Sequence, residues 1–144
     1  MILDTTYLLP LVGIGVDVDL LRSIVEGRAP LSLSDVKVSL VSLFELQAKA
    51  AKYDVPVDRV IMAIEAIERA FPVIPFTAPR IVEVSLHLRR TLLKDYIDAV
   101  IAATAIALEE PLVTEDKDIH AVAHNLEREY KIKIYSYRKL LSKS

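Results

Sequence analysis

Hydrophobic positions along the chain form short runs that alternate with longer segments of helical periodicity. The short runs are rich in aliphatic and β-branched residues, which is typical of buried parallel strands. They lie at residues 1–3, 36–40, 73–76, 112–114 and 132–135. Between them, apolar residues recur at spacings of three and four, which is typical of amphipathic helices. These predicted helices span residues 17–26, 42–52, 56–71, 77–90, 95–108 and 118–130.

The alternation of strands and helices predicts the fold class. No Asn-Gly or Asp-Gly pair marks a tight hairpin. We therefore predict an α/β protein with three α/β/α layers and a central parallel sheet of five strands. The helix at residues 95–108 is rich in alanine, and its small side chains should let it lie close against this sheet.

Composition narrows the class of protein further. With 144 residues, the chain is expected to form a single domain over residues 1–144. It has no Cys, which excludes disulfides, thiolate zinc sites and iron–sulfur clusters. The longest uncharged apolar stretch, residues 5–16, is shorter than the ~20 residues of a membrane span, and no basic region opens a secretory signal. We therefore expect a cytoplasmic protein without a membrane segment, and the net charge of −2 argues against a general polyanion-coating protein.

Four acidic residues stand at positions where a parallel sheet places its ligands, beyond the carboxyl ends of the strands. Asp4 follows the first predicted strand, and Asp116 follows the fourth. Glu45 lies in the first turn of the helix after the second strand, and Asp98 lies in the first turn of the alanine-rich helix. If these strands are neighbours, the four carboxylates converge at one edge of the sheet.

Taken singly, most of these acids also have a purely structural explanation. Ser42-Leu43-Phe44-Glu45 has the form of a capping box, so Glu45 can stabilise a helix start. Asp98 can do the same with Asp95 as the N-cap, and Asp116 or Asp118 can cap the last long helix. Asp4 is harder to explain in this way, because a charge at the end of a hydrophobic strand is costly unless it is paired or coordinated.

Convergence of the four acids points to chemistry. Two carboxylates about 5 Å apart repel by roughly 3 kcal/mol at an effective dielectric near 20. The four motifs contain no equal number of Lys or Arg, so a divalent cation with oxygen ligands, Mg²⁺ or Mn²⁺, is the simplest means of neutralisation. Such ions activate water and stabilise the leaving oxygen in phosphodiester hydrolysis. The residues therefore indicate a metal-dependent nuclease.

Four segments, MILDTT (1–6), SLFEL (42–46), DAVIAATA (98–105) and LVTEDKD (112–118), each contain one of these acids. In this order and spacing they resemble the PIN domain family, and more narrowly its single-domain VapC-type toxin ribonucleases. The resemblance covers almost the whole chain. It implies a parallel five-stranded sheet between helices and Mg²⁺- or Mn²⁺-dependent endonuclease action on RNA. It also implies a cognate antitoxin that masks the site, and a homodimer.

The resemblance assigns the roles of individual residues. The catalytic, metal-binding acids are Asp4, Glu45, Asp98 and Asp116. The hydroxyls of Thr6 and Thr114 would orient carboxylates or waters, which is a common task of residues behind metal ligands. Asp95 and Asp118 are extra acids beside the site, so either Asp116 or Asp118 can be the fourth ligand; we favour Asp116.

Other charged residues have weaker signals. Arg89, Arg90 and Lys94 precede Asp98 and could attract RNA phosphates, although basic residues also favour the C-terminal end of a helix for its dipole. His120 and His124 are four residues apart and could share a metal, but two ordinary helix histidines are the better interpretation.

Two functions from different classes remain open. The first is an endoribonuclease that acts as the toxin of a toxin–antitoxin pair. The alternative is a catalytically silent PIN-like module that binds RNA or a protein partner. A phosphotransfer receiver domain fits poorly, because no second acid lies two residues after Asp4 and no Asp ends the strand at 36–40.

Overall fold

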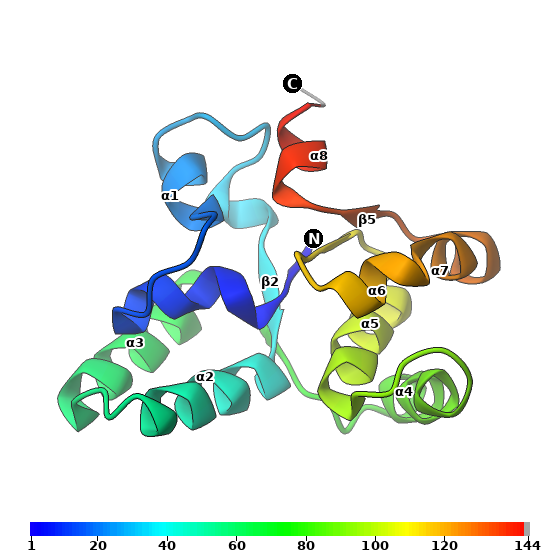
Figure 1. Ribbon diagram of the computed structural model, residues 1–144, viewed down its shortest axis with the longest axis horizontal. Helices are drawn as coiled ribbons and strands as arrows, with labels where there is room; N and C mark the ends of the chain where they lie inside the picture. The colour runs from blue at the N-terminus through cyan, green and yellow to red at the C-terminus, as the bar shows by residue number, and fades with distance from the viewer. Residues whose placement is uncertain (143–144) are drawn as a thin grey trace.

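The structure is a computed structural model that describes residues 1–142 of the chain (Figure 1). Its centre is a sheet of five parallel strands in the order β3-β2-β1-β4-β5. The strands are β1 (Ile2–Leu3), β2 (Lys37–Ser39), β3 (Val73–Ile74), β4 (Leu112–Val113) and β5 (Ile134–Tyr135). In the central strand, Leu3 is level with Val38 on one side and Val113 on the other. The predicted parallel sheet is confirmed.

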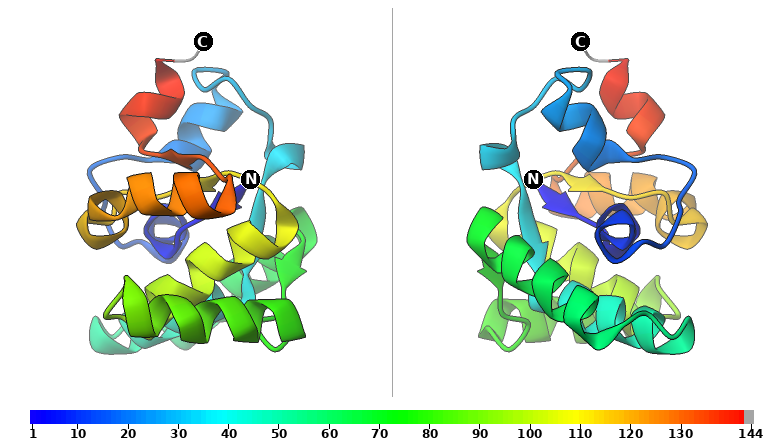
Figure 2. Two further views of the ribbon diagram at one scale, coloured as in Figure 1. Left: turned by 90° about the vertical axis from the view of Figure 1, so that its right-hand side faces the viewer. Right: turned by 90° about the vertical axis from the view of Figure 1, so that its left-hand side faces the viewer.

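Helices connect the strands and cover both faces of the sheet (Figures 1 and 2). The 3-10 helices are η1 (Thr5–Val12) and η2 (Leu33–Asp35). The α-helices are α1 (Leu20–Val25), α2 (Leu40–Lys52), α3 (Val57–Ala70), α4 (Pro79–Thr91), α5 (Tyr96–Leu108), α6 (Lys117–Ala121), α7 (Ala123–Tyr130) and α8 (Tyr137–Leu141). Within residues 1–142, none of these helices combines the length and the apolar character that a membrane crossing requires.

The short strands divide their side chains between two hydrophobic cores. In β1, Ile2 packs into one core and Leu3 into the other, because successive side chains of a strand point to opposite faces. The same split separates Leu112 from Val113 in β4 and continues in β5. The first core is closed by η1, α1, α3 and α8, and the second by α4, α5, α6 and α7. The arrangement is therefore the predicted three-layer α/β/α fold.

Helix α5 is central, as its alanines predict. Ala99, Ala102, Ala103 and Ala105 are fully buried, and α5 packs between α4 and the strands β1 and β2. Its N-cap is Asp95, whose Oδ1 accepts a hydrogen bond from the Asp98 amide at 3.1 Å. The close approach of this helix to the sheet brings its first turn, and with it Asp98, to the carboxyl ends of the strands.

The predicted capping box at Ser42 is wrong. The helix begins at Leu40, directly after β2, and its N-cap is Ser39, whose Oγ accepts a hydrogen bond from the Val41 amide at 3.2 Å. Ser39 and Ser42 both precede residues that favour a helix. Strand β2 ends at Ser39, earlier than the predicted end at residue 40, so Ser39 becomes the N-cap. Ser42 is therefore inside the helix and fully buried. Glu45 consequently lies in the second turn, not the first.

Two further differences concern the segments that flank the site. Residues 118–130, predicted as one helix, are divided at Val122 into α6 and α7. The apolar run after Asp4 forms η1, which ends at Gly13 with a left-handed φ of 78°. Helix α8 was not predicted, because its few residues give too short a periodic pattern.

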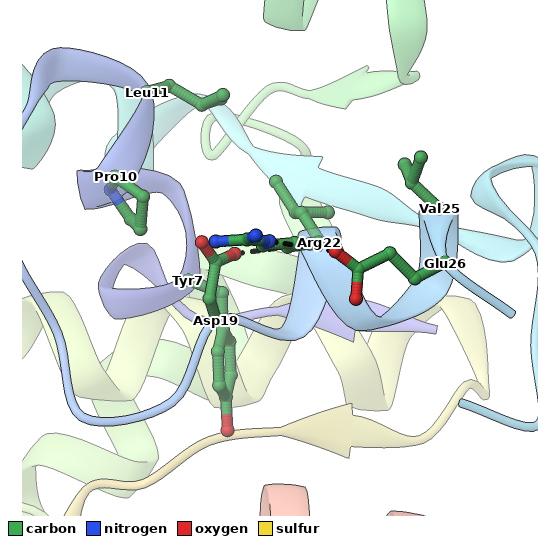
Figure 3. A pocket seen from close by; sticks show the side chains of 8 residues that line it. Tyr7, Pro10, Leu11, Asp19, Arg22, Val25 and Glu26 are labelled. Carbon is green, nitrogen blue, oxygen red and sulfur yellow. Dashed lines mark hydrogen bonds and ion pairs between the residues drawn. The ribbon is translucent and has the colours of Figure 1, made fainter. Parts of the chain in front are cut away.

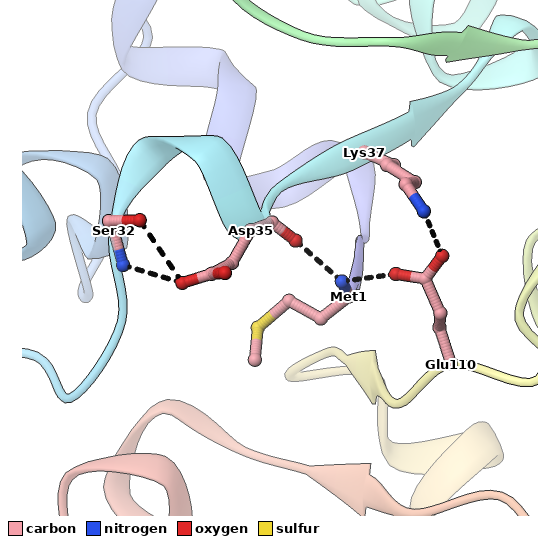
Figure 4. Close-up of polar contacts among 5 residues, drawn as sticks. All are labelled: Met1, Ser32, Asp35, Lys37 and Glu110. Atoms are coloured by element: carbon pink, nitrogen blue, oxygen red, sulfur yellow. Dashed lines mark hydrogen bonds and ion pairs between the residues drawn. The ribbon is translucent and has the colours of Figure 1, made fainter.

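Ion pairs join the strands at the amino end of the sheet (Figure 4). The Met1 ammonium donates to Glu110 Oε1 and to the Asp35 carbonyl, each at 2.6 Å. The other oxygen of Glu110 pairs with Lys37. These contacts tie β1 to the residues before β2 and β4, at the opposite end of β1 from Asp4.

Candidate active site

Asp4 directly follows the central strand, and only 6% of its surface is exposed. Its Oδ1 accepts a hydrogen bond from the Thr5 amide at 2.7 Å, and its Oδ2 accepts one from the Thr114 hydroxyl at 2.6 Å. Burial raises the pKa of Asp4 from its ordinary value to about 6, although these two hydrogen bonds oppose the rise. The charges of Glu45 and Asp116 raise this pKa further. Asp4 is thus a buried carboxylate at the carboxyl edge of the sheet.

Thr114 joins the carboxyl ends of the adjacent strands β1 and β4. Its hydroxyl donates to Asp4 and accepts a hydrogen bond from the Asp116 amide at 3.0 Å. Its carbonyl accepts a hydrogen bond from His120 Nε2 at 2.7 Å. Thr114 therefore orients the Asp4 carboxylate directly and positions the backbone of Asp116.

Asp98 is half-buried in the first turn of α5. Burial is the largest cause of its raised pKa, which reaches about 7. Neighbouring carboxylates also raise this pKa, and they are, in decreasing order of effect, Asp116, Asp95, Asp4 and Glu45. Among residues 1–142, no hydrogen bond to the carboxylate of Asp98 offsets this repulsion. The side chain therefore sits inside a field of like charges.

The loop after β4 supplies two more carboxylates to this cluster. One oxygen each from Asp98, Asp116 and Asp118 lies within 4.8 Å of the others. Asp116 is half-buried, and its Oδ1 caps α6 by accepting a hydrogen bond from the Ile119 amide at 3.0 Å. Asp118 is exposed. Asp116 therefore does cap a helix, as the structural explanation expects. Its Oδ2 accepts no hydrogen bond from the described residues, so this oxygen remains available to a metal ion.

The four acids singled out from the sequence thus come together from four separate elements. Asp4 and Asp116 follow neighbouring strands, while Asp98 and Glu45 stand on α5 and α2. Asp4 and Glu45 lie outside the group of three close carboxylates formed by Asp98, Asp116 and Asp118. They are nevertheless near enough for their charges to raise the pKa of Asp98. The donor set consists of carboxylate oxygens, which are the ligands that Mg²⁺ and Mn²⁺ prefer.

Other residues predicted near the site take varied positions. Asp95 is an exposed N-cap beside Asp98. The hydroxyl of Thr6, which is half-buried, makes no hydrogen bond to an acid of the site within the described part of the chain. His120 and His124 lie on different helices, so the spacing that suggested a shared metal is lost.

Three cations lie at the turn that leads into α5. Arg89 and Arg90 are in the last turn of α4, and Lys94 is in the connection to α5. All three side chains are exposed, and none forms an ion pair with residues 1–142. Their positions fit both the stabilisation of the C-terminal end of α4 and attraction of a polyanion.

A pocket of about 360 Å³ opens elsewhere, between η1 and α1 (Figure 3). Its lining includes Leu11, Val25 and the exposed pair Arg22–Glu26, but none of the four acids. The acid cluster is therefore not part of this cavity. In Figure 3 the Tyr7 hydroxyl points away from Arg22 and Glu26.

That hydroxyl belongs to a contact that the sequence did not indicate. Tyr7 is fully buried and donates to Glu115 Oε2 at 2.5 Å. Burial, and then the hydrogen bond to Glu115, raise the pKa of Tyr7 above its usual range, so the phenol stays a donor. The two residues are 108 positions apart, and no periodicity or motif in the sequence relates them.

The structure defines an α/β/α protein with a parallel sheet and carboxylates gathered at the carboxyl edge of that sheet. The chain belongs to the PIN domain family, a family of nucleases, because the model of that family matches residues 1–125. This confirms the resemblance found in the four acidic motifs. A search of curated proteins found no significant relative.

Solved structures share the fold at low sequence identity. A toxin–antitoxin complex from Klebsiella pneumoniae contains a chain that is 24% identical, with a TM-score of 0.62 over 84% of this chain and 91% of that one. VapBC2 from Rickettsia felis, bound to a promoter DNA fragment, gives 18% identity and a TM-score of 0.65 over 94% and 97%. VapBC-5 from Mycobacterium tuberculosis gives 20% identity and a TM-score of 0.60 over 94% and 96%.

Proposed function

We propose that this protein is an endoribonuclease whose carboxylates hold Mg²⁺ or Mn²⁺. The observation that carries the proposal is the environment of Asp98, a half-buried carboxyl whose pKa is raised to about 7 and which feels the charges of Asp116, Asp4 and Glu45. Such a cluster is unfavourable in a purely structural role. Its oxygen donors fit a hard divalent cation, which would neutralise the repulsion.

Each residue of the site has a separate role in the proposed reaction. Asp4, Glu45, Asp98 and Asp116 hold the ion, with Asp118 as a further carboxylate at the same edge. When bound, Mg²⁺ or Mn²⁺ would lower the pKa of a coordinated water and stabilise the leaving oxygen of the phosphodiester. Thr114 fixes the orientation of Asp4 and the backbone of Asp116.

RNA binding requires positive charge near this acidic edge, because carboxylates repel phosphates. Arg89, Arg90 and Lys94 are exposed beside the start of α5, and we assign them to the attraction of RNA phosphates. They would act on the sugar–phosphate backbone and therefore contribute affinity more than sequence selectivity.

The proposal also includes a protein partner. The similar solved structures are toxin–antitoxin assemblies, so we infer that this chain is a cytoplasmic toxin that a cognate antitoxin inhibits. Helices α2 and α3 expose apolar side chains at Phe44, Val57, Ile61 and Met62, which support association with another protein. We further infer a homodimer; light scattering should then give twice the chain mass of 16.1 kDa.

The experiment that tests the nuclease is incubation of the purified protein with total cellular RNA and Mn²⁺, followed by sequencing of new 5′ ends. The controls are a chelator and Asp98→Asn, which removes a charge with little change in shape. Discrete ends that require wild-type protein and metal would support the proposal. A folded Asp98→Asn protein with full activity would overturn the assignment of Asp98. RNA binding without metal-dependent cleavage would instead favour the silent binding module.

A further inference from the structure

Glu115 stands between two residues of the proposed site in the sequence, but its carboxylate bonds to residues of other elements. Thr114 binds Asp4 on one side of the chain, and Asp116 belongs to the carboxylate group with Asp98. The Glu115 carboxylate, which is half-buried, instead accepts two hydrogen bonds at Oε2. It is absent from the group of close carboxylates formed by Asp98, Asp116 and Asp118.

The first of these hydrogen bonds comes from η1. Tyr7 follows Asp4 by three residues, its amide donates to the Asp4 carbonyl at 3.3 Å, and its hydroxyl donates to Glu115 at 2.5 Å. The junction after β1 and the junction after β4 are therefore joined twice, by Thr114 to Asp4 and by Tyr7 to Glu115.

The second hydrogen bond comes from the opposite direction. The amide of Tyr137, the first residue of α8, donates to Glu115 Oε2 at 2.7 Å. The Tyr137 hydroxyl in turn lies 2.6 Å from Ser23 Oγ on α1. One carboxylate thus connects the loop that carries Asp116 to η1 and to α8, and through α8 to α1.

From this geometry we propose that Glu115 is a positioning residue, which fixes the turn from Thr114 to Asp116 so that the Asp116 carboxylate is held ready for the metal. This role rests on the proposed function of Asp116 and deepens it. Ligands of a metal site depend on the groups that hold them, and loss of such a group typically weakens metal affinity by about 10–100-fold.

The test measures the Mn²⁺ dissociation constant by calorimetry, on the full chain and well below the melting temperature of every variant. Glu115→Ala should weaken Mn²⁺ binding by about 10–100-fold. Tyr7→Phe, which removes one donor and keeps the carboxylate, should weaken it less. Glu115→Gln keeps an oxygen that can accept both hydrogen bonds, so it should bind Mn²⁺ nearly as well as wild type. The double variant Tyr7→Phe/Glu115→Ala should match Glu115→Ala alone, because both changes break one contact.

A matched control separates positioning from general stability. Glu127 Oε1 accepts a hydrogen bond from the Ile134 amide at 3.1 Å, so Glu127 is also a half-buried glutamate that binds a backbone amide, here at the start of β5. Glu127→Ala should lower the melting temperature and leave the Mn²⁺ dissociation constant unchanged. A Glu115→Ala variant that behaves in the same way would overturn the proposal.

Glu115→Gln decides between geometry and charge. If it binds Mn²⁺ as weakly as Glu115→Ala, the negative charge and not the hydrogen bonds would be responsible, and the positioning role would be wrong. Because the readout needs no substrate, it is separate from the test of function. A wild-type protein that binds Mn²⁺ without cleaving RNA would refute the nuclease and leave the comparison of variants valid. A wild-type protein that binds no Mn²⁺ would overturn both.

Discussion

Replacement of Asp98 by Asn should stabilise the metal-free protein at alkaline pH. Asp98 has a pKa of about 7 in the folded state, against an ordinary value of 3.8. Between these two values the folded protein keeps a proton that the unfolded chain has released. Stability therefore falls as the pH rises from about 4 to about 7 and stays at its lower level above that range. Asn cannot ionise, so Asp98→Asn removes this loss.

The size of the effect follows from the pKa shift. One unit of pKa corresponds to about 1.36 kcal/mol, so a rise from 3.8 to about 7 sets an upper limit of about 4 kcal/mol. Asp98 is only half-buried, and solvent screening should reduce this to roughly 2 kcal/mol. For a chain of this length, that gain corresponds to a rise in Tm of about 4–8 °C.

Thermal unfolding followed by circular dichroism in a chelator measures the difference. The Tm of Asp98→Asn should exceed that of wild type at pH 8, and the gap should shrink to roughly a third at pH 5, where folded Asp98 is protonated. The matched control is Asp17→Asn, which removes an exposed carboxyl outside the cluster. An equal gap at both pH values for Asp98→Asn would refute the electrostatic reasoning.

Three further predictions concern metal, pH and the hydroxyl between the strands. Mg²⁺ or Mn²⁺ at 100 times its dissociation constant should stabilise wild type by about 2.7 kcal/mol, and calorimetry should show a smaller gain for Asp4→Asn; equal gains would argue against Asp4 as a ligand. Metal-dependent RNA cleavage should increase between about pH 6 and 7, as Asp4 and Asp98 ionise, and a rate that declines over this range contradicts the assignment. Thr114→Val should lower the free energy of unfolding by denaturant by about 1–3 kcal/mol and abolish most RNA cleavage. The control is Thr104→Val, whose buried hydroxyl bonds only a carbonyl of its own helix; it should lower stability and leave cleavage unchanged.

The fold was predictable because its signals are local and repeated. All the strands except β2 consist of apolar residues, since the sheet is covered on both sides, and β2, β3 and β4 are followed by segments of clear helical periodicity. The start of α2 was not predictable, because Ser39 and Ser42 are equally good N-caps by residue type and only the length of β2 decides between them. The break at Val122 likewise has no Gly or Pro to mark it.

The acids of the candidate site were predictable for a topological reason. Carboxyl ends of parallel strands meet at one edge, so Asp4 and Asp116 had to be neighbours once β1 and β4 were. Contacts that span the chain give no such signal. The hydrogen bond from Tyr7 to Glu115 depends on how η1 and the loop after β4 pack together, which no sequence pattern records.

Helix capping explains part of the acidic cluster and fails for the rest. Asp95 and Asp116 each accept a hydrogen bond from a helical amide, so their presence alone would be consistent with a structural role. Asp98 accepts none from residues 1–142, and no Lys or Arg of those residues forms an ion pair with it, although its pKa shows that the folded state resists its charge. The ion pairs of the sheet are instead at its amino end, where Lys37 and the Met1 ammonium neutralise Glu110. The proposed cation site would account for Asp98, which helix capping does not explain.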